Sequence, residues 1–216
     1  MAPRAGLTEI PLMDVAPAMC CAPVAEAGLT DRVEVLFEDY RDLSGRYDKL
    51  VSIEMIEAVG AEAYDDYFAA CARHLSPTGI MVLQAIVIAE DRYERALRSV
   101  DFIQKHIFPG SCIPSVSAIE ASVARATDLA VIRTEDITPH YVRTLRDWRQ
   151  RFLAAADQIR AAGFPDRFIG LWHWYLAYCE GGFAERRIGD VQMVLAKPLS
   201  SIRNETRATA DAGAQP

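Results

Sequence analysis

Short apolar runs alternate with segments of helical periodicity along most of this chain, and this alternation constrains its fold more than any other feature. The predicted strands are residues 33–37, 49–53, 80–88, 129–134 and 191–196. The predicted helices are residues 61–75, 117–126, 141–162 and 168–183. Strands that alternate with helices are typical of an α/β domain with a mostly parallel sheet, and we predict one such domain.

Particular residues support these predictions. Residues 49–53 are apolar enough to be buried on both faces of a sheet. In the helix predicted at residues 61–75, Tyr64, Phe68 and Cys71 share one face. Ser117 and Glu120 have the spacing of a capping box, which predicts the start of the next helix.

The composition divides the chain and excludes several classes of protein. Residues 1–23 contain four prolines and no sustained periodicity, so we predict an irregular segment there, a domain at residues 24–198 and a frayed tail at residues 199–216.

A net charge of −7 opposes nonspecific binding to nucleic acids. Five cysteines without C-x-x-C spacing disfavour a disulfide framework and a metal site. No secretory signal is recognisable, so we expect a cytoplasmic protein.

The ends of the predicted strands indicate where chemistry occurs. Ligands of such sheets bind outside the carboxyl ends of the strands, which directs attention to the polar residues just after Phe37, Ile53 and Leu83. Glu57 follows the second of these strands by a few residues. A carboxylate beside an apolar pocket is desolvated and can orient a proton acceptor, whereas the alternative is a solvated acid at a helix start.

Several separated motifs occur in one order along residues 24–198 and resemble the middle of cyclopropane-fatty-acid synthases and mycolic acid cyclopropane synthases. They are residues 39–43 (DYRDL), 47–60 (YDKLVSIEMIEAVG), 64–68 (YDDYF), 107–115 (IFPGSCIPS), 148–152 (WRQRF) and 175–183 (YLAYCEGGF). The ordered set is far more specific than any single motif.

The resemblance implies a fold, an activity and partners. The fold is a Rossmann-like α/β methyltransferase with a helical acyl-chain cover formed by about residues 88–126 and 141–183. The activity is transfer of a methyl group from S-adenosylmethionine to a cis double bond, which forms a cyclopropane or a methylated fatty acid. The implied partners are an unsaturated acyl phospholipid and a second copy in a homodimer, with peripheral contact at the inner membrane face.

The resemblance also implies site residues. Methyl addition to an alkene leaves a carbocation that must lose a proton, and members of the family hold a bicarbonate ion as the base. Glu57 matches the carboxylate that grips this ion, Tyr141 matches the tyrosine, and the backbone contact falls at Ile86. Tyr40 matches an aromatic residue that stacks on adenine, with Asp39 nearby.

The chain departs from the family pattern at two places. Gln84 stands at the histidine position of the bicarbonate site, and an amide forms hydrogen bonds but carries no charge. The sequence also contains no G-x-G, so the glycine-rich cofactor loop and the acidic ribose ligand are missing from it. Two alternatives to an active enzyme follow: an inactive remnant that no longer binds the cofactor, and a non-catalytic lipid-binding or partner subunit.

Other polar residues have common structural roles. Arginines at positions 143, 146, 149 and 151 are candidates for contacts with lipid phosphates, although charged residues on helices usually form a solvated face. His173, Cys112 and Cys179 have no neighbouring partner in sequence that favours chemistry, and we assign them to packing.

Overall fold

The computed structural model describes residues 21–36 and 38–205, and the chain divides into two units, residues 1–44 and 45–216. In the first unit, residues 21–26 are helical and residues 33–36 form no strand. The strand predicted at residues 33–37 is therefore wrong over its first four residues, and Phe37 lies outside the described residues. Val33 and Leu36 are both exposed, so they lack the packed neighbours that stabilise an extended strand.

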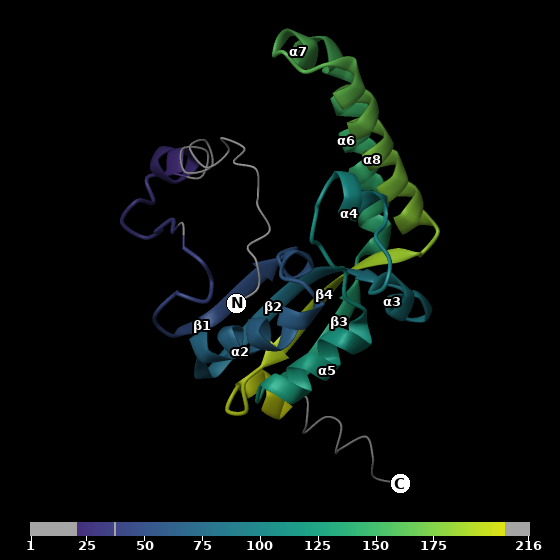
Figure 1. The fold of residues 1–216 in the computed structure, drawn as a ribbon. Coiled ribbons are helices and arrows are strands. Elements are labelled where there is room, and N and C mark those ends of the chain that lie inside the picture. Colours follow the sequence, from purple (N-terminus) through teal and green to yellow (C-terminus); the bar gives the residue numbers. More distant parts are fainter. Residues whose placement is uncertain (1–20, 37, 206–216) are drawn as a thin grey trace. The chain divides into compact units, whose positions relative to one another are not determined.

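The second unit is built on a four-stranded sheet. Its strands are β1 (Tyr47–Ile53), β2 (Leu75–Ile88), β3 (Ala130–Asp136) and β4 (Ile188–Ala196), in the spatial order β1-β2-β4-β3 (Figure 1). β1 and β2 are parallel, whereas β4 is antiparallel to both of its neighbours. The strands predicted in this unit are confirmed, but the prediction of a mostly parallel sheet is wrong.

The helices of this unit form two groups. They are η1 (Ile56–Ala58), η2 (Ala61–Ala63), α2 (Tyr64–His74), α3 (Glu90–Ala96), α4 (Phe102–His106), α5 (Val116–Ala126), α6 (Thr138–Ala154), α7 (Ala156–Ala161) and α8 (Asp166–Ala184). Figure 1 shows α2 and α5 on one face of the sheet, and α6 and α8 as a hairpin that extends past the end of the sheet with α7 at its tip. The helix predicted at residues 141–162 is thus two helices. Because the hairpin returns the chain to the end where β3 stops, β4 must run antiparallel to β3.

The core lies between the sheet and the pair α2 and α5. Met81, Leu83 and Ala85 alternate along β2, and each is fully buried. Ser52 of β1 pairs in register with Leu83 and accepts a hydrogen bond from the hydroxyl of Tyr67 on α2, at 2.6 Å. The even-numbered side chains of β2 lie on the opposite face of the sheet, because successive side chains of a strand alternate.

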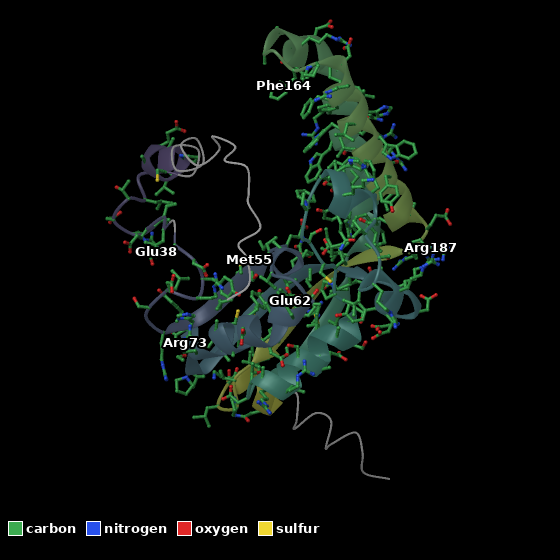
Figure 2. The ribbon with its side chains drawn as sticks, in the orientation of Figure 1. Glu38, Met55, Glu62, Arg73, Phe164 and Arg187 are labelled. Atoms are coloured by element: carbon green, nitrogen blue, oxygen red, sulfur yellow. The ribbon has the colours of Figure 1, made fainter. Side chains whose placement is uncertain are left out.

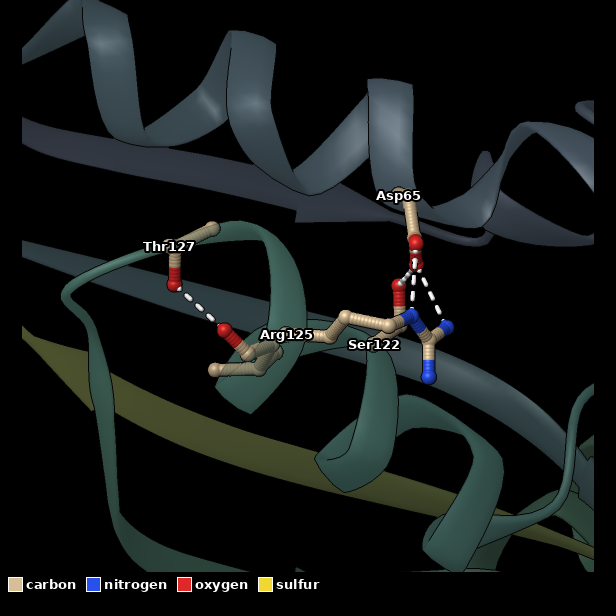
Figure 3. A network of polar contacts seen from close by, with 5 residues as sticks. Asp65, Ser122, Arg125 and Thr127 are labelled. Carbon is tan, nitrogen blue, oxygen red and sulfur yellow. Dashed lines mark hydrogen bonds and ion pairs between the residues drawn. The ribbon is translucent and has the colours of Figure 1, made fainter.

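A polar network ties α5 to α2 (Figure 3). The carboxylate of Asp65 on α2 accepts hydrogen bonds from Ser122 Oγ at 2.5 Å, from Arg125 Nε at 2.7 Å and from Arg125 Nη2 at 2.7 Å. The hydrogen bonds from Arg125 and Ser122 lower the pKa of Asp65 to about 2. This network fixes the two helices in register over the sheet.

The start of α5 corrects one prediction. Its N-cap is Ser115, whose Oγ accepts the backbone N–H of Ala118 at 3.2 Å. Ser117, the predicted cap, instead donates its backbone N–H to Glu90 at 2.9 Å, in the first turn of α3. Both serines precede the apolar run of the helix, so sequence spacing alone does not separate them.

β1 forms an edge of the sheet and leaves one face open. Among the described residues its only strand partner is β2. Val51 and Ile53 point away from α2 and are 64% and 62% exposed, so the prediction that residues 49–53 are buried on both faces is wrong. An apolar edge strand with unpaired backbone groups is a template for pairing with another chain.

We expect this edge to make the chain self-associate at micromolar concentrations. Val51→Lys places a charge on the exposed edge and should at least halve the scattered intensity without lowering the melting temperature, because the native side chain is already exposed. Dynamic light scattering and thermal melts measure both quantities, with Val100→Lys, at another exposed valine, as the control. A monodisperse parent chain would contradict this expectation.

Candidate active site

Glu54 is the centre of a polar cluster at the carboxyl end of β1. It is the first residue after the strand and adopts a positive φ of 51°, and its backbone N–H donates to the carbonyl of Gln84 at 2.9 Å. Its side chain accepts two hydrogen bonds: Gln84 Nε2 donates to Oε1 at 3.0 Å, and the hydroxyl of Tyr141 donates to Oε2 at 2.9 Å. A left-handed backbone is unusual outside glycine, and here it aims the carboxylate at β2 and α6.

Gln84 joins two carboxylates. Its Nε2 donates to Glu54 and also to Asp190 Oδ2, at 3.1 Å, while its Oε1 accepts from Gln192 Nε2 at 3.0 Å. Both N–H groups of the amide are therefore engaged by acids of the protein. In this arrangement Gln84 orients carboxylates and has no N–H left to donate to an anion.

Asp190 lies on β4 opposite Ile86 and is fully buried. Its Oδ1 has no hydrogen-bond partner among the described residues. Burial, followed by the charges of Glu54 and Glu57, raises the pKa of Asp190 to about 7. The backbone N–H of Asp190 donates to Thr138 Oγ1 at 3.1 Å, which holds β4 against the start of α6.

Glu57 lies in the short helix η1 and faces the same end of β2. Its Oε1 accepts the backbone N–H of Ile86 at 2.5 Å, and its Oε2 is buried without a partner in the described part of the chain. Burial raises the pKa of this carboxyl to about 7, although the hydrogen bond from Ile86 acts in the opposite direction. The backbone carbonyl of Glu57 accepts the N–H of Cys112 at 2.7 Å, which holds the turn in place.

An apolar aromatic cluster borders these acids on the side of the hairpin. Leu145 of α6 and Leu176 and Phe183 of α8 form its buried centre, and Ile86 and Tyr141 pack against it. The ring of Tyr141 stacks on Phe183 with 4.6 Å between centroids. Tyr141 thus has its ring in the apolar cluster and its hydroxyl on Glu54.

The structure brings most of the predicted site residues together, in two pairs. Glu57 meets the backbone of Ile86, while Gln84 and Tyr141 meet at Glu54. Their roles in binding or catalysis stay predictions. Asp39 and Tyr40 belong to the first unit, where Asp39 accepts hydrogen bonds from Arg41 Nε at 2.8 Å and Nη2 at 2.6 Å, and their predicted contact with adenine also stays a prediction.

No role was assigned to Glu54 or Asp190 from the sequence alone. The rule that chemistry follows the carboxyl ends of parallel strands pointed to the residue after Ile53, which is Glu54. No such signal marks Asp190, because β4 enters the site from its amino end as an antiparallel strand. Three acids converge here, yet no group of His, Cys, Asp and Glu among the described residues is arranged to hold a metal ion.

Comparison with known protein families shows which family the chain belongs to. The family model for mycolic acid cyclopropane synthetase matches residues 9–193. The chain belongs to this family. It is 40% identical over 174 residues to the tuberculostearic acid methyltransferase UfaA1 of Mycobacterium tuberculosis. This match covers 81% of the chain and 41% of that protein. It is also 36% identical over 169 residues to the cyclopropane-fatty-acyl-phospholipid synthase of Escherichia coli. This match covers 78% of the chain and 42% of that protein.

Solved structures confirm the predicted methyltransferase fold. The crystal structure of the mycolic acid cyclopropane synthase CmaA1 complexed with SAH and CTAB matches with a TM-score of 0.70 and 27% identity, covering 79% of this chain and 65% of that one. The [4+2]-cyclase SpnF shares the fold at 18% identity and a TM-score of 0.62. The chain spans about two-fifths of the length of the two curated relatives named above. No helix in the described ranges has the length and apolar character needed to cross a bilayer.

Proposed function

We propose that this chain carries the acyl-binding and catalytic part of a methyltransferase that transfers a methyl group from S-adenosylmethionine to the cis double bond of an unsaturated acyl phospholipid. One observation carries the proposal. Three carboxyl groups, Glu54, Glu57 and Asp190, converge beside an aromatic apolar cluster, and no ion pair with a basic residue is formed by any of them in the described part of the chain. The family membership and the SAH-bound relative support the same donor.

This arrangement suits a reaction that passes through a cation. The π electrons of the alkene form the new bond to the methyl carbon, the carbon–sulfur electron pair stays on sulfur, and positive charge develops on the second alkene carbon. In their ionised forms these carboxyl groups supply negative charge next to the apolar aromatic cluster, where electrostatic stabilisation is strong. The ring of Tyr141, whose hydroxyl contacts Glu54, also favours a nearby cation through its π electrons. Loss of a proton then completes the reaction.

The residues fit a bicarbonate ion when the carboxyl group of Glu57 is protonated. An anion needs donors, and the N–H of Ile86, the amide of Gln84 and the hydroxyl of Tyr141 are already engaged by carboxylates. A protonated Glu57 has an O–H that can donate to an anion, and its raised pKa makes that form accessible at neutral pH. Bicarbonate, when bound there, supplies a base for the departing proton.

Label transfer tests the proposal. Incubate the chain with methyl-labelled S-adenosylmethionine at millimolar concentration and a monounsaturated phosphatidylglycerol dispersed in detergent, and extract the lipid. We expect label in the acyl chains of this lipid and none in a fully saturated phosphatidylglycerol. The same assay is run on a second chain to which a segment with a glycine-rich cofactor loop has been joined. If neither chain labels the lipid, the proposal is refuted. Homodimer formation stays a separate prediction, which sedimentation addresses.

A further inference from the structure

The tip of the α6 and α8 hairpin is exposed and apolar. Figure 2 shows Phe164 at this tip, beyond the end of the sheet. Phe164 is 49% exposed, and Leu153 at the end of α6 is 40% exposed. A surface hollow of about 420 Å³ opens beside them, lined by Phe164, Pro165, Arg167, Phe168 and Leu171. Large aromatic and aliphatic side chains at the far end of a projecting element are typical of a contact surface.

Aromatic rings connect this tip to the candidate active site. Phe164 stacks on Phe168 with 4.7 Å between centroids, Phe168 stacks on Trp172 at 5.5 Å, and Trp172 meets Tyr175 at 5.2 Å. Tyr175 packs against the cluster that contains Ile86 and Tyr141. From Phe164 to Tyr175 the helix rises by about 16 Å, which is about half the thickness of the hydrocarbon core of a bilayer. The aromatic row thus joins the tip to the apolar cluster that borders the acids.

The charge of the hairpin differs from that of the whole chain. Residues 138–184 contain six arginines and four acidic residues, whereas the chain carries a net charge of −7. Among these residues, Arg146 and Arg149 pair with Glu180, and Arg160 pairs with two aspartates. No carboxylate of the described chain pairs with Arg143, Arg151 or Arg167, and Arg151 and Arg167 lie within residues 151–168 at the end of the hairpin. Cations beside exposed aromatic side chains complement the anionic headgroups of a membrane surface.

We propose that the hairpin tip, defined here as residues 151–168, inserts into the headgroup region of an anionic lipid bilayer, so that an acyl chain passes along Trp172 and Tyr175 toward Glu57. The inference rests on the proposed function for the identity of the acyl substrate. Aromatic side chains prefer the membrane interface, and arginine side chains reach phosphates from the same depth. The acidic remainder of the chain stays away from the anionic surface, which orients the domain with the tip toward the lipid.

Tryptophan fluorescence reports membrane binding by the hairpin, because all three tryptophans, Trp148, Trp172 and Trp174, lie on α6 and α8, on either side of the tip in sequence. Titrate the full chain with vesicles of dimyristoylphosphatidylglycerol, and separately of dimyristoylphosphatidylcholine. These lipids are saturated, so binding to them is independent of methyl transfer. We expect a blue shift with the anionic vesicles that weakens as salt is raised, and a weaker response with the neutral ones.

Phe164→Ser locates the contact. We expect it to lower vesicle affinity about fivefold to tenfold, because the exposed part of one aromatic side chain no longer enters the interface. Leu199→Ser, at a 66% exposed leucine on the far side of the sheet from the hairpin, is the matched control and should bind as the parent chain does. A parent chain that binds neither vesicle, or a Phe164→Ser chain that binds both as the parent does, would overturn the inference. Loss of self-association in Phe164→Ser with unchanged vesicle binding would also overturn it, because the tip would then be a protein contact.

An activity assay separates this inference from the proposed function. At limiting vesicle concentration, Phe164→Ser should transfer methyl groups to monounsaturated phosphatidylglycerol about fivefold to tenfold more slowly than the parent chain, and it should match the parent when the same lipid is dissolved in detergent. A parent chain that binds vesicles but methylates neither form of the lipid supports the membrane contact and refutes the activity. Equal loss of activity in vesicles and in detergent would refute the membrane role of Phe164.

Discussion

Glu57→Gln is expected to abolish methyl transfer and to raise stability at neutral and alkaline pH. The amide keeps the shape of the side chain and can still accept the N–H of Ile86, but it cannot exchange a proton or carry negative charge. We expect label transfer to fall by at least a hundredfold, in the range that a lost acid or base group costs. Transfer of methyl label to monounsaturated phospholipid measures this loss.

The stability effect depends on the sign of the pKa shift. Burial raises the pKa of Glu57 from 4.5 to about 7, so between these values the folded chain holds a proton that the unfolded chain has released. Stability therefore falls as pH rises through this window, and the loss is complete above about pH 7. Gln removes this penalty, and we expect the variant to be about 2 kcal/mol more stable at pH 8, or about 5 °C in melting temperature, and equal to the parent near pH 4.5.

Glu62→Gln is the matched control for both measurements, because Glu62 is an exposed acid five positions along the chain. It should leave the rate and the melting curve unchanged. Thermal melts from pH 4.5 to pH 8 of the parent, Glu57→Gln and Glu62→Gln give the comparison. A Glu57→Gln chain with full activity would remove this residue from the reaction, whatever its effect on stability.

S-adenosylmethionine is expected to bind only in the millimolar range to the 216-residue chain alone. The sequence contains no G-x-G, and the backbone of a glycine-rich loop normally approaches the cofactor closely. Loss of about 4 kcal/mol of contacts turns a micromolar ligand into a millimolar one. Isothermal titration calorimetry measures this affinity.

A second chain, extended upstream by a segment with a glycine-rich loop and an acidic ribose ligand, is the comparison. We expect it to bind S-adenosylmethionine about a thousandfold more tightly than the 216 residues alone. Its additional strands would also pair with β1 and lower the self-association expected from Val51 and Ile53. Low-micromolar binding by the 216 residues would show that they complete the cofactor site by other residues.

Much of the second unit was predictable because its side chains repeat with clear periods. The apolar run at residues 80–88 identified β2 as a central strand, and the aromatic-rich segment at residues 168–183 identified α8. The break between α6 and α7 was not predictable, because Ala154 and Ala155 are good helix formers and no proline or glycine marks the end of α6.

The site was only half predictable, for a reason of topology. Glu54 directly follows β1, and Gln84 is in register with Ile53, the last residue of that parallel strand. Asp190 reaches that edge from an antiparallel strand, and only the return of the α6 and α8 hairpin brings it there. Both N–H groups of Gln84 donate to acids that lie far from it in the sequence, Glu54 and Asp190. These hydrogen bonds could therefore not be predicted from the residues next to Gln84.

The position of the transferred methyl carbon tests the central claim most directly. Relatives in fold include N-methyltransferases such as the phosphoethanolamine enzyme of Haemonchus contortus, so the fold alone does not separate carbon from nitrogen as the acceptor. Supply carbon-13 methyl S-adenosylmethionine and a monounsaturated phosphatidylethanolamine, which offers both acceptors in one molecule, and record the carbon-13 spectrum of the extracted lipid. The account predicts label only on carbon at the former double bond, as a cyclopropane methylene or a methyl branch. Label on the headgroup nitrogen, with the double bond intact, would contradict it.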